Sequence, residues 1–245
     1  MSENKEEVVV KTTQSESGDV LEKAKGFWSK YSKKITYAGT IVIVVLGGWI
    51  AYQKFVKEPK EEKANETIFL AETLFSKLAS TSFGKDSVNI VLNGGELDGV
   101  KITGLLKVIN NYDGTAAANR ARYMTGATYL HVKEFDKAIK YLKDFKGNGA
   151  DQIQSKAYVL LGHAYAEKKQ TSDALNYYKK AAEVNEKDQS VSPDALMLAA
   201  GYAEYTGKNE EAVSLYKKIK EKYPTYSAVN SGELDKILAR LGVLE

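Results

Sequence analysis

The side chains that most often carry chemistry are scarce in this sequence. It holds two histidines, His131 and His163, and no cysteine. A bound transition metal needs three or four clustered ligands, so this set does not predict a metal site. The glycines between positions 94 and 104 fit neither GxGxxG nor a P-loop, and no serine lies in a GxSxG elbow. We therefore expect no catalytic residue, metal or cofactor, and predict that the protein is not an enzyme.

Composition favours an all-α protein. Of the 245 residues, 43% are hydrophobic and three are proline, and β-branched alternation is confined to one stretch. The formal net charge of +3 is too small to indicate a nucleic-acid-binding protein. Without cysteine there are no disulfides or thiolates, but this does not assign a compartment.

Residues 155–186 read as two short helices joined by a polar turn. The apolar positions of the first helix recur at spacings of three and four and share one face: Tyr158, Leu161, Gly162 and Tyr165. Ser172 is the predicted N-cap of the second helix. Gly162 and Ala174 are small where the helices must approach closely. Such a pair needs similar neighbours to bury its apolar face.

Those neighbours exist. The interval of twelve residues from Gly162 to Ala174 recurs from Gly126 to Ala138 and from Ala200 to Ala212. Pro224 is placed to end the third unit. These residues, and the turn from Thr206 to Ala212, resemble the tetratricopeptide repeat. The resemblance implies an α-solenoid of about three helix pairs whose period slightly exceeds the usual one of roughly 34 residues.

The flanks of these pairs suggest further helices. A degenerate leading pair is expected from one helix with Ile68, Leu74 and Leu78 and another with Ile102, Leu105 and Ile109, separated by a long loop over 82–100. Thr115 is the predicted cap of the next helix. Ser231 is the predicted cap of a C-terminal capping helix.

The run from Ile35 to Gln53 carries no charge and as a helix would measure about 28 Å, close to the hydrocarbon thickness of a bilayer. We interpret it as a transmembrane helix rather than a buried core helix or a cleaved signal peptide. The predicted organisation is a disordered tail (1–19), a basic amphipathic juxtamembrane helix (20–34), the transmembrane helix (35–53), a charged connector (54–66) and a tetratricopeptide-repeat-like domain (67–245).

Lysines flank the run on both sides. Five precede it between positions 23 and 34, and four follow it between 54 and 63. The count slightly favours a cytoplasmic N-terminus and a C-terminal domain outside the cytoplasm. An inverted anchor with a cytoplasmic repeat domain is the alternative.

From about Val20 onward the chain resembles the YfgM-like family of single-span inner-membrane proteins. The closest local likeness is GTAAANRARYMTGATYLHVKEFDKA, from Gly114 to Ala138. The resemblance implies a bacterial inner-membrane protein with a periplasmic repeat domain. It also implies an ancillary subunit of the Sec translocon that contacts periplasmic chaperones or unfolded clients. An adaptor for cell-wall synthesis or outer-membrane assembly, with no export role, is the alternative.

The expected working surface is the concave side of the stacked first helices, and both histidines should face it. Its mixture of aromatic, methionine and single charged residues suits an extended or helical peptide rather than a small-molecule substrate. It lacks the Lys/Asn/Arg set of a carboxylate clamp. By helical phase the predicted protein-binding groove contains Arg120, Tyr123, Leu130, His131, Lys156, Val159, His163, Glu167, Met197, Glu204 and Tyr205.

Overall fold

A computed structural model describes residues 6–243, and these divide into two compact units between Pro59 and Lys60. The first unit is dominated by helix α1 (Glu6–Tyr52), followed by a π-helical turn, η1 (Gln53–Lys57). Its apolar part is fully unburied: within the described residues, one helix is long and apolar enough to cross a membrane, with a mean hydropathy of 1.8 over its best window. The Thr36 and Thr40 hydroxyls donate to carbonyl oxygens one turn back, so these polar groups are satisfied inside the helix.

The N-terminal segments differ from expectation in one respect. Residues 6–19, which the sequence predicts to be disordered, belong to α1, whereas residues 1–5 lie outside the described residues. Once a helix is nucleated, each added residue gains a hydrogen bond, which favours extension of the apolar helix into the polar segment before it. The predicted juxtamembrane and transmembrane segments are likewise parts of one helix.

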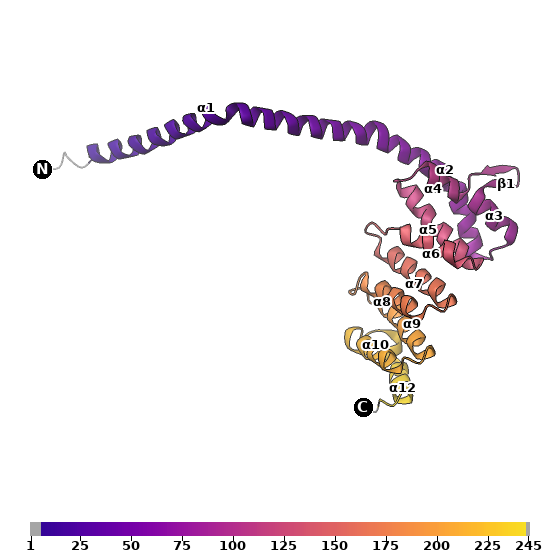
Figure 1. The fold of residues 1–245 in the computed structure, drawn as a ribbon. Helices are drawn as coiled ribbons and strands as arrows, with labels where there is room; N and C mark the ends of the chain where they lie inside the picture. The colour runs from indigo at the N-terminus through magenta and orange to yellow at the C-terminus, as the bar shows by residue number, and fades with distance from the viewer. Residues whose placement is uncertain (1–5, 244–245) are drawn as a thin grey trace. The chain divides into compact units, whose positions relative to one another are not determined.

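The second unit is a succession of helices and one hairpin (Figure 1). It begins with α2 (Glu58–Ser80), α3 (Lys85–Asn93), β1 (Gly95–Leu97), β2 (Val100–Ile102) and α4 (Leu105–Asn111). Three antiparallel helix pairs follow: α5 (Ala116–His131) with α6 (Phe135–Asp144), α7 (Asp151–Glu167) with α8 (Thr171–Glu183), and α9 (Val191–Tyr205) with α10 (Asn209–Lys222). The short α11 (Ser227–Asn230) and α12 (Glu233–Arg240) close the stack. The predicted helical solenoid with a leading segment and a terminal cap is confirmed.

The prediction of a long loop over residues 82–100 is wrong, because this stretch contains α3 and most of a β-hairpin. Asp98 and Gly99 both have positive φ, 51° and 78°, which is the pattern of a two-residue hairpin turn. Ile102, assigned from sequence to a helix, pairs with Gly95 in the sheet. A Cβ on Gly104 would lie 2.3 Å from the backbone nitrogen of Gly94. Gly94 and Gly104 therefore serve close backbone approach.

Of the three predicted helix N-caps, one is correct and two are wrong. The Thr115 side chain accepts a hydrogen bond from the amide of Ala118 at 3.1 Å, as expected of an N-cap. Ser172 is not the cap of α8, because that helix begins one residue earlier, at Thr171. Ser231 is not the cap of α12, because Gly232 takes that position with a φ of 69°. Only a glycine enters this left-handed conformation without strain.

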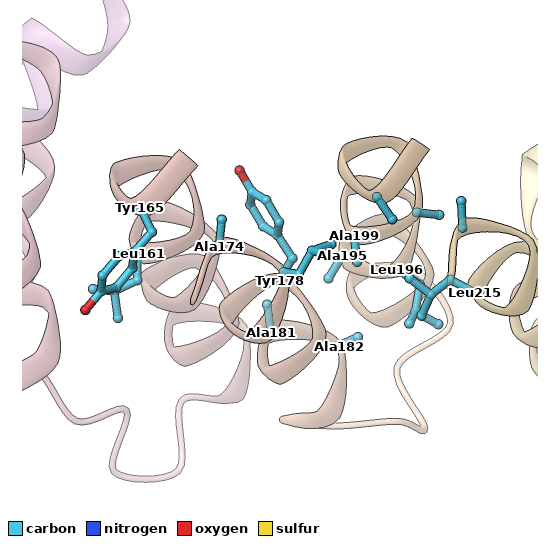
Figure 2. Close-up of a cluster of buried hydrophobic side chains, with 14 of the residues drawn as sticks. Leu161, Tyr165, Ala174, Tyr178, Ala181, Ala182, Ala195, Leu196, Ala199 and Leu215 are labelled. Carbon is cyan, nitrogen blue, oxygen red and sulfur yellow. The ribbon is translucent and has the colours of Figure 1, made fainter. Parts of the chain in front are cut away.

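Small residues let the paired helices touch. A Cβ on Gly162 would lie 2.4 Å from Cε1 of Tyr178, and one on Gly126 would lie 2.5 Å from Cγ of Leu142. Both large side chains are buried and fill the space that the glycines leave. Figure 2 shows Tyr178 between Ala174 and the Ala195–Ala199 side of the next repeat. The expectation of close approach is confirmed at Gly162, and Ala174 is fully buried.

We predict that Gly162→Ala lowers the free energy of unfolding by about 1–3 kcal/mol, because the new methyl group displaces the buried Tyr178 ring. Denaturant unfolding of the full-length protein in detergent, followed by circular dichroism, measures this change. The matched control is Gly201→Ala, whose Cβ would meet only the Tyr216 hydroxyl oxygen, at 4.0 Å. This control should gain about 0.5–1 kcal/mol from restricted backbone freedom. Equal effects of the two substitutions would contradict the close-approach explanation.

Candidate functional site

A cleft of about 360 Å³ opens where the end of α5, the start of α6 and the end of α7 meet. We call it the central cleft. Four residues of the predicted groove line it together: Leu130, His131, His163 and Glu167. The other lining residues are Lys133, Phe135 and Ala166. Both histidines of the chain therefore line the same cleft.

His131 is held by a ring from outside the repeats. Its imidazole stacks on Phe83, with ring centroids 3.9 Å apart and planes inclined by 14°. Phe83 lies in the connection between α2 and α3 and also contacts Phe75 edge-on. Partial burial lowers the pKa of His131, which favours the neutral ring at pH 7.

His163 is held by a hydrogen bond with Tyr178 of α8. Its Nδ1 lies 2.8 Å from the Tyr178 hydroxyl oxygen. A buried hydroxyl group donates its hydrogen to an acceptor. We therefore assign the Tyr178 hydroxyl as the donor and Nδ1 of His163 as the acceptor. The proton of the neutral imidazole is then on Nε2. Burial lowers the pKa of His163, and the nearby Glu167 carboxylate offsets this only in part. Burial also raises the pKa of the Tyr178 phenol.

The charges at the central cleft are few and balanced. Lys133 lies in the turn between α5 and α6 with a φ of 63°, and Glu167 is exposed at the end of α7. The two neutral imidazoles add no charge, so the described lining holds one cation and one anion. A strongly charged ligand therefore finds only one counter-charge in this lining.

Several residues of the predicted groove make contacts within the protein, and these contacts account for the residues without a binding partner. Arg120 donates to the Glu72 carboxylate at 2.7 Å and to Asn65, which ties α5 to α2. Tyr123 packs against Phe145, with ring centroids 5.4 Å apart.

Near the C-terminal end of the stack, Glu204 accepts from Arg240 at 2.6 Å. Val159 and Met197 are half-buried against the core, Lys156 is exposed, and Tyr205 is 85% exposed. The structure thus brings four of the predicted residues into one cleft and places the others outside it.

Sequence reasoning missed Phe83, Lys133 and Phe135. Lys133 and Phe135 come directly after the predicted helix that contains His131. Their position in a turn beside His131 could therefore have been predicted from the sequence. Phe83 was not accessible in this way, because it reaches His131 only through the tertiary packing of α2 against the repeats. Within the described part of the chain, no three His, Asp or Glu side chains gather as they would around a metal ion.

The lowered pKa of His163 leads to a testable pH dependence. The unfolded chain binds this proton more tightly, with an ordinary pKa of about 6.5. Its contribution to stability is therefore complete above that value and is lost as the pH falls toward the folded pKa. We expect His163→Asn, which keeps an acceptor for Tyr178, to show a smaller loss in free energy of unfolding between about pH 7.5 and pH 5.5 than the wild type. Denaturant titrations at both pH values measure this, and an unchanged pH dependence would contradict it.

Comparison with known families gives two matches in the second unit. Residues 155–188 and residues 194–226 each match the tetratricopeptide repeat. They correspond to α7 with α8 and to α9 with α10. A search of curated proteins found no match. The chain therefore contains two tetratricopeptide repeats, which are typically non-enzymatic modules for protein interaction.

Proposed function

We propose that this protein is a membrane-anchored scaffold that holds other proteins. The observation that carries the proposal is the presence, in one chain, of tetratricopeptide repeats and an apolar helix that remains unburied. A helix that is apolar all round needs either a protein core or lipid around it. The central cleft offers a concave surface with few charges, which suits a peptide segment of a partner.

The finer proposal places the protein in the bacterial inner membrane, with a cytoplasmic N-terminus and a periplasmic repeat domain. Its partners would be translocon subunits and periplasmic chaperones or unfolded clients. The resemblance to YfgM-like proteins and the small lysine excess before the span support this choice. An adaptor for cell-wall or outer-membrane assembly has the same architecture and differs only in its partners.

The anchor predicts a charge-sensitive membrane association. Arginines at Val44 and Leu46 lie near the centre of the apolar run, where each costs about 2.5–3.5 kcal/mol. We expect the double variant Val44→Arg, Leu46→Arg to move largely into the soluble fraction after an alkaline wash of membranes. The control, Ser29→Arg with Ser32→Arg, adds the same charge before the run and should stay in the pellet. Retention of the first variant would argue against a spanning helix.

Photocrosslinking from the central cleft identifies the partners. A photoreactive residue in place of Glu167, in the central cleft, should yield crosslinked adducts with envelope proteins, whereas one in place of the exposed Phe69 should yield few. Translocon or chaperone components in the adducts support the export role, and wall or outer-membrane machinery supports the alternative.

Protease added to intact spheroplasts should digest the repeat domain. Full protection of that domain would reverse the proposed orientation.

A further inference from the structure

The part of α1 that directly precedes the apolar run is basic. Its last three charged residues, Lys30, Lys33 and Lys34, are exposed, and we call them the lysine cluster. By helical phase they fall within about 100° of one another, so they share one face of α1. The sequence holds no aspartate or glutamate in residues 23–57. The nearest carboxylate before the cluster is therefore that of Glu22, about 12 Å away along the helix axis.

The lysines that follow the apolar run have a different setting. Lys60 donates to the carbonyl oxygen of Asp113 at 2.7 Å. The Glu61 carboxylate accepts from the backbone amide of Ala116 at 2.9 Å. Charges of both signs are interspersed in this segment: Lys54, Lys57, Lys60 and Lys63 with Glu58, Glu61 and Glu62. The excess of positive charge therefore lies before the run, at the lysine cluster.

The lysine cluster lies at the depth of lipid headgroups when the apolar run spans the hydrocarbon core. Helix α1 continues without interruption from the cluster into the run. With a rise of about 1.5 Å per residue, the three lysines are about 1.5, 3 and 7.5 Å from Ile35 along the helix axis. A headgroup layer is roughly 5–8 Å deep on each side of the core. All three ammonium groups therefore reach this layer.

One aromatic contact holds Lys30 beside a ring. Its Nζ lies 5.5 Å from the ring centroid of Tyr31, and that ring packs against Phe27 with centroids 4.9 Å apart. Tyrosine is common at membrane interfaces, because its ring is apolar and its hydroxyl is polar. A cation–π contact at an exposed site is weak. It therefore leaves the ammonium group of Lys30 able to bind a full negative charge.

We infer that the lysine cluster binds the headgroups of anionic phospholipids; this rests on the proposed membrane anchor and specifies the lipid around it. Phosphate oxygens of the headgroup accept hydrogen bonds, and each ammonium group has three donors. In a zwitterionic lipid the cationic amine cancels the phosphate charge, so the cluster attracts it less. Each lysine close to an anionic membrane surface strengthens binding by about fivefold.

A lipid fits this position better than an acidic segment of a partner protein does. Headgroups surround α1 at this depth once the run is in the membrane, so their local concentration is high. An acidic peptide would also lose conformational entropy on binding. The lysine cluster is continuous with the apolar surface of α1, where Ile35 is 42% exposed. A molecule with a negative headgroup and apolar chains matches both surfaces at once.

Energy transfer from Trp28 to a labelled lipid tests the inference in vesicles that contain the full-length protein. Trp28 lies about 10 Å from Ile35 along the helix axis, and Trp49→Phe leaves it as the single tryptophan of the chain. The vesicles are phosphatidylcholine with a trace of either phosphatidylglycerol or phosphatidylcholine, each carrying the same pyrene on an acyl chain. We expect labelled phosphatidylglycerol to be enriched around Trp28 at least about threefold over labelled phosphatidylcholine.

Substitutions in the lysine cluster separate charge from side-chain shape. The triple variant Lys30→Gln, Lys33→Gln, Lys34→Gln should lower the enrichment to about onefold, because it removes the three charges. Arginine at the same three positions keeps the charge and should keep the enrichment. In the unsubstituted cluster, about 0.5 M sodium chloride shortens the Debye length to about 4 Å and should reduce the enrichment as well.

The matched control removes the same charge from the other side of the apolar run. It is the triple variant Lys54→Gln, Lys57→Gln, Lys63→Gln, which should leave the enrichment at Trp28 unchanged. Lys60 is kept in this control because it holds the carbonyl oxygen of Asp113.

Several results would overturn the inference. These are equal transfer to the two labelled lipids, the same enrichment with glutamine in the lysine cluster, or an enrichment that high salt does not reduce. Loss of the enrichment on addition of a soluble polyglutamate peptide would identify an acidic protein segment as the occupant instead. Retention in alkaline-washed membranes is measured on the same protein. Retention without lipid preference rejects this inference alone, whereas loss of retention rejects the anchor.

Discussion

The close approach of paired helices at Gly126 and Gly162 is the constraint on which the second unit depends. No methyl group fits at either position, because Leu142 and Tyr178 already occupy the space. Each pair is thereby locked at short range, and its remaining apolar residues face the next pair. The same contact brings the Tyr178 hydroxyl to within 2.8 Å of His163. Packing of the repeat and orientation of a cleft residue therefore arise from one side chain.

The segment before the repeats contributes more than a lead-in. Glycines let the hairpin and α3 fold back closely, with Gly94 and Gly104 in backbone contact range. The connection between α2 and α3 also presents Phe83 to His131. A ring from this connection thus extends the surface of the first helix pair. The central cleft depends on the leading segment as well as on the repeats that match the family motif.

The two units differ in whether their apolar side chains are buried or exposed. In the repeats, alanines, leucines and tyrosines are buried against neighbouring pairs. Along the apolar part of α1, valines and isoleucines remain exposed, with Ile43 at 71% and Val44 at 67%. Water does not favour such a surface, and the hydroxyls of Thr36 and Thr40 are satisfied within the helix. These features support the proposed placement of α1 in a membrane.

The sequence by itself determined the parts that follow from local periodicity. Spacings of three, four and twelve residues were sufficient for the helix pairs, and the uncharged run from Ile35 to Gln53 was sufficient for a long apolar helix. Close approach at Gly162 was also readable, because a small residue that recurs at one position of each unit has few other uses. Turn chemistry was less reliable: Thr115 caps its helix, whereas Ser231 yields the position to Gly232.

Tertiary structure alone decided which residues meet across elements. Helical phase placed Arg120 and His131 on one predicted face, yet Arg120 is bound to Glu72, and His131 lines the cleft. Phe83 could not be foreseen, because its distance in sequence from His131 carries no periodic signal. Periodicity reports which side of a helix is apolar, whereas the partner of each side chain depends on how neighbouring helices are packed. For that reason the fold was largely readable from the chain, and the site was not.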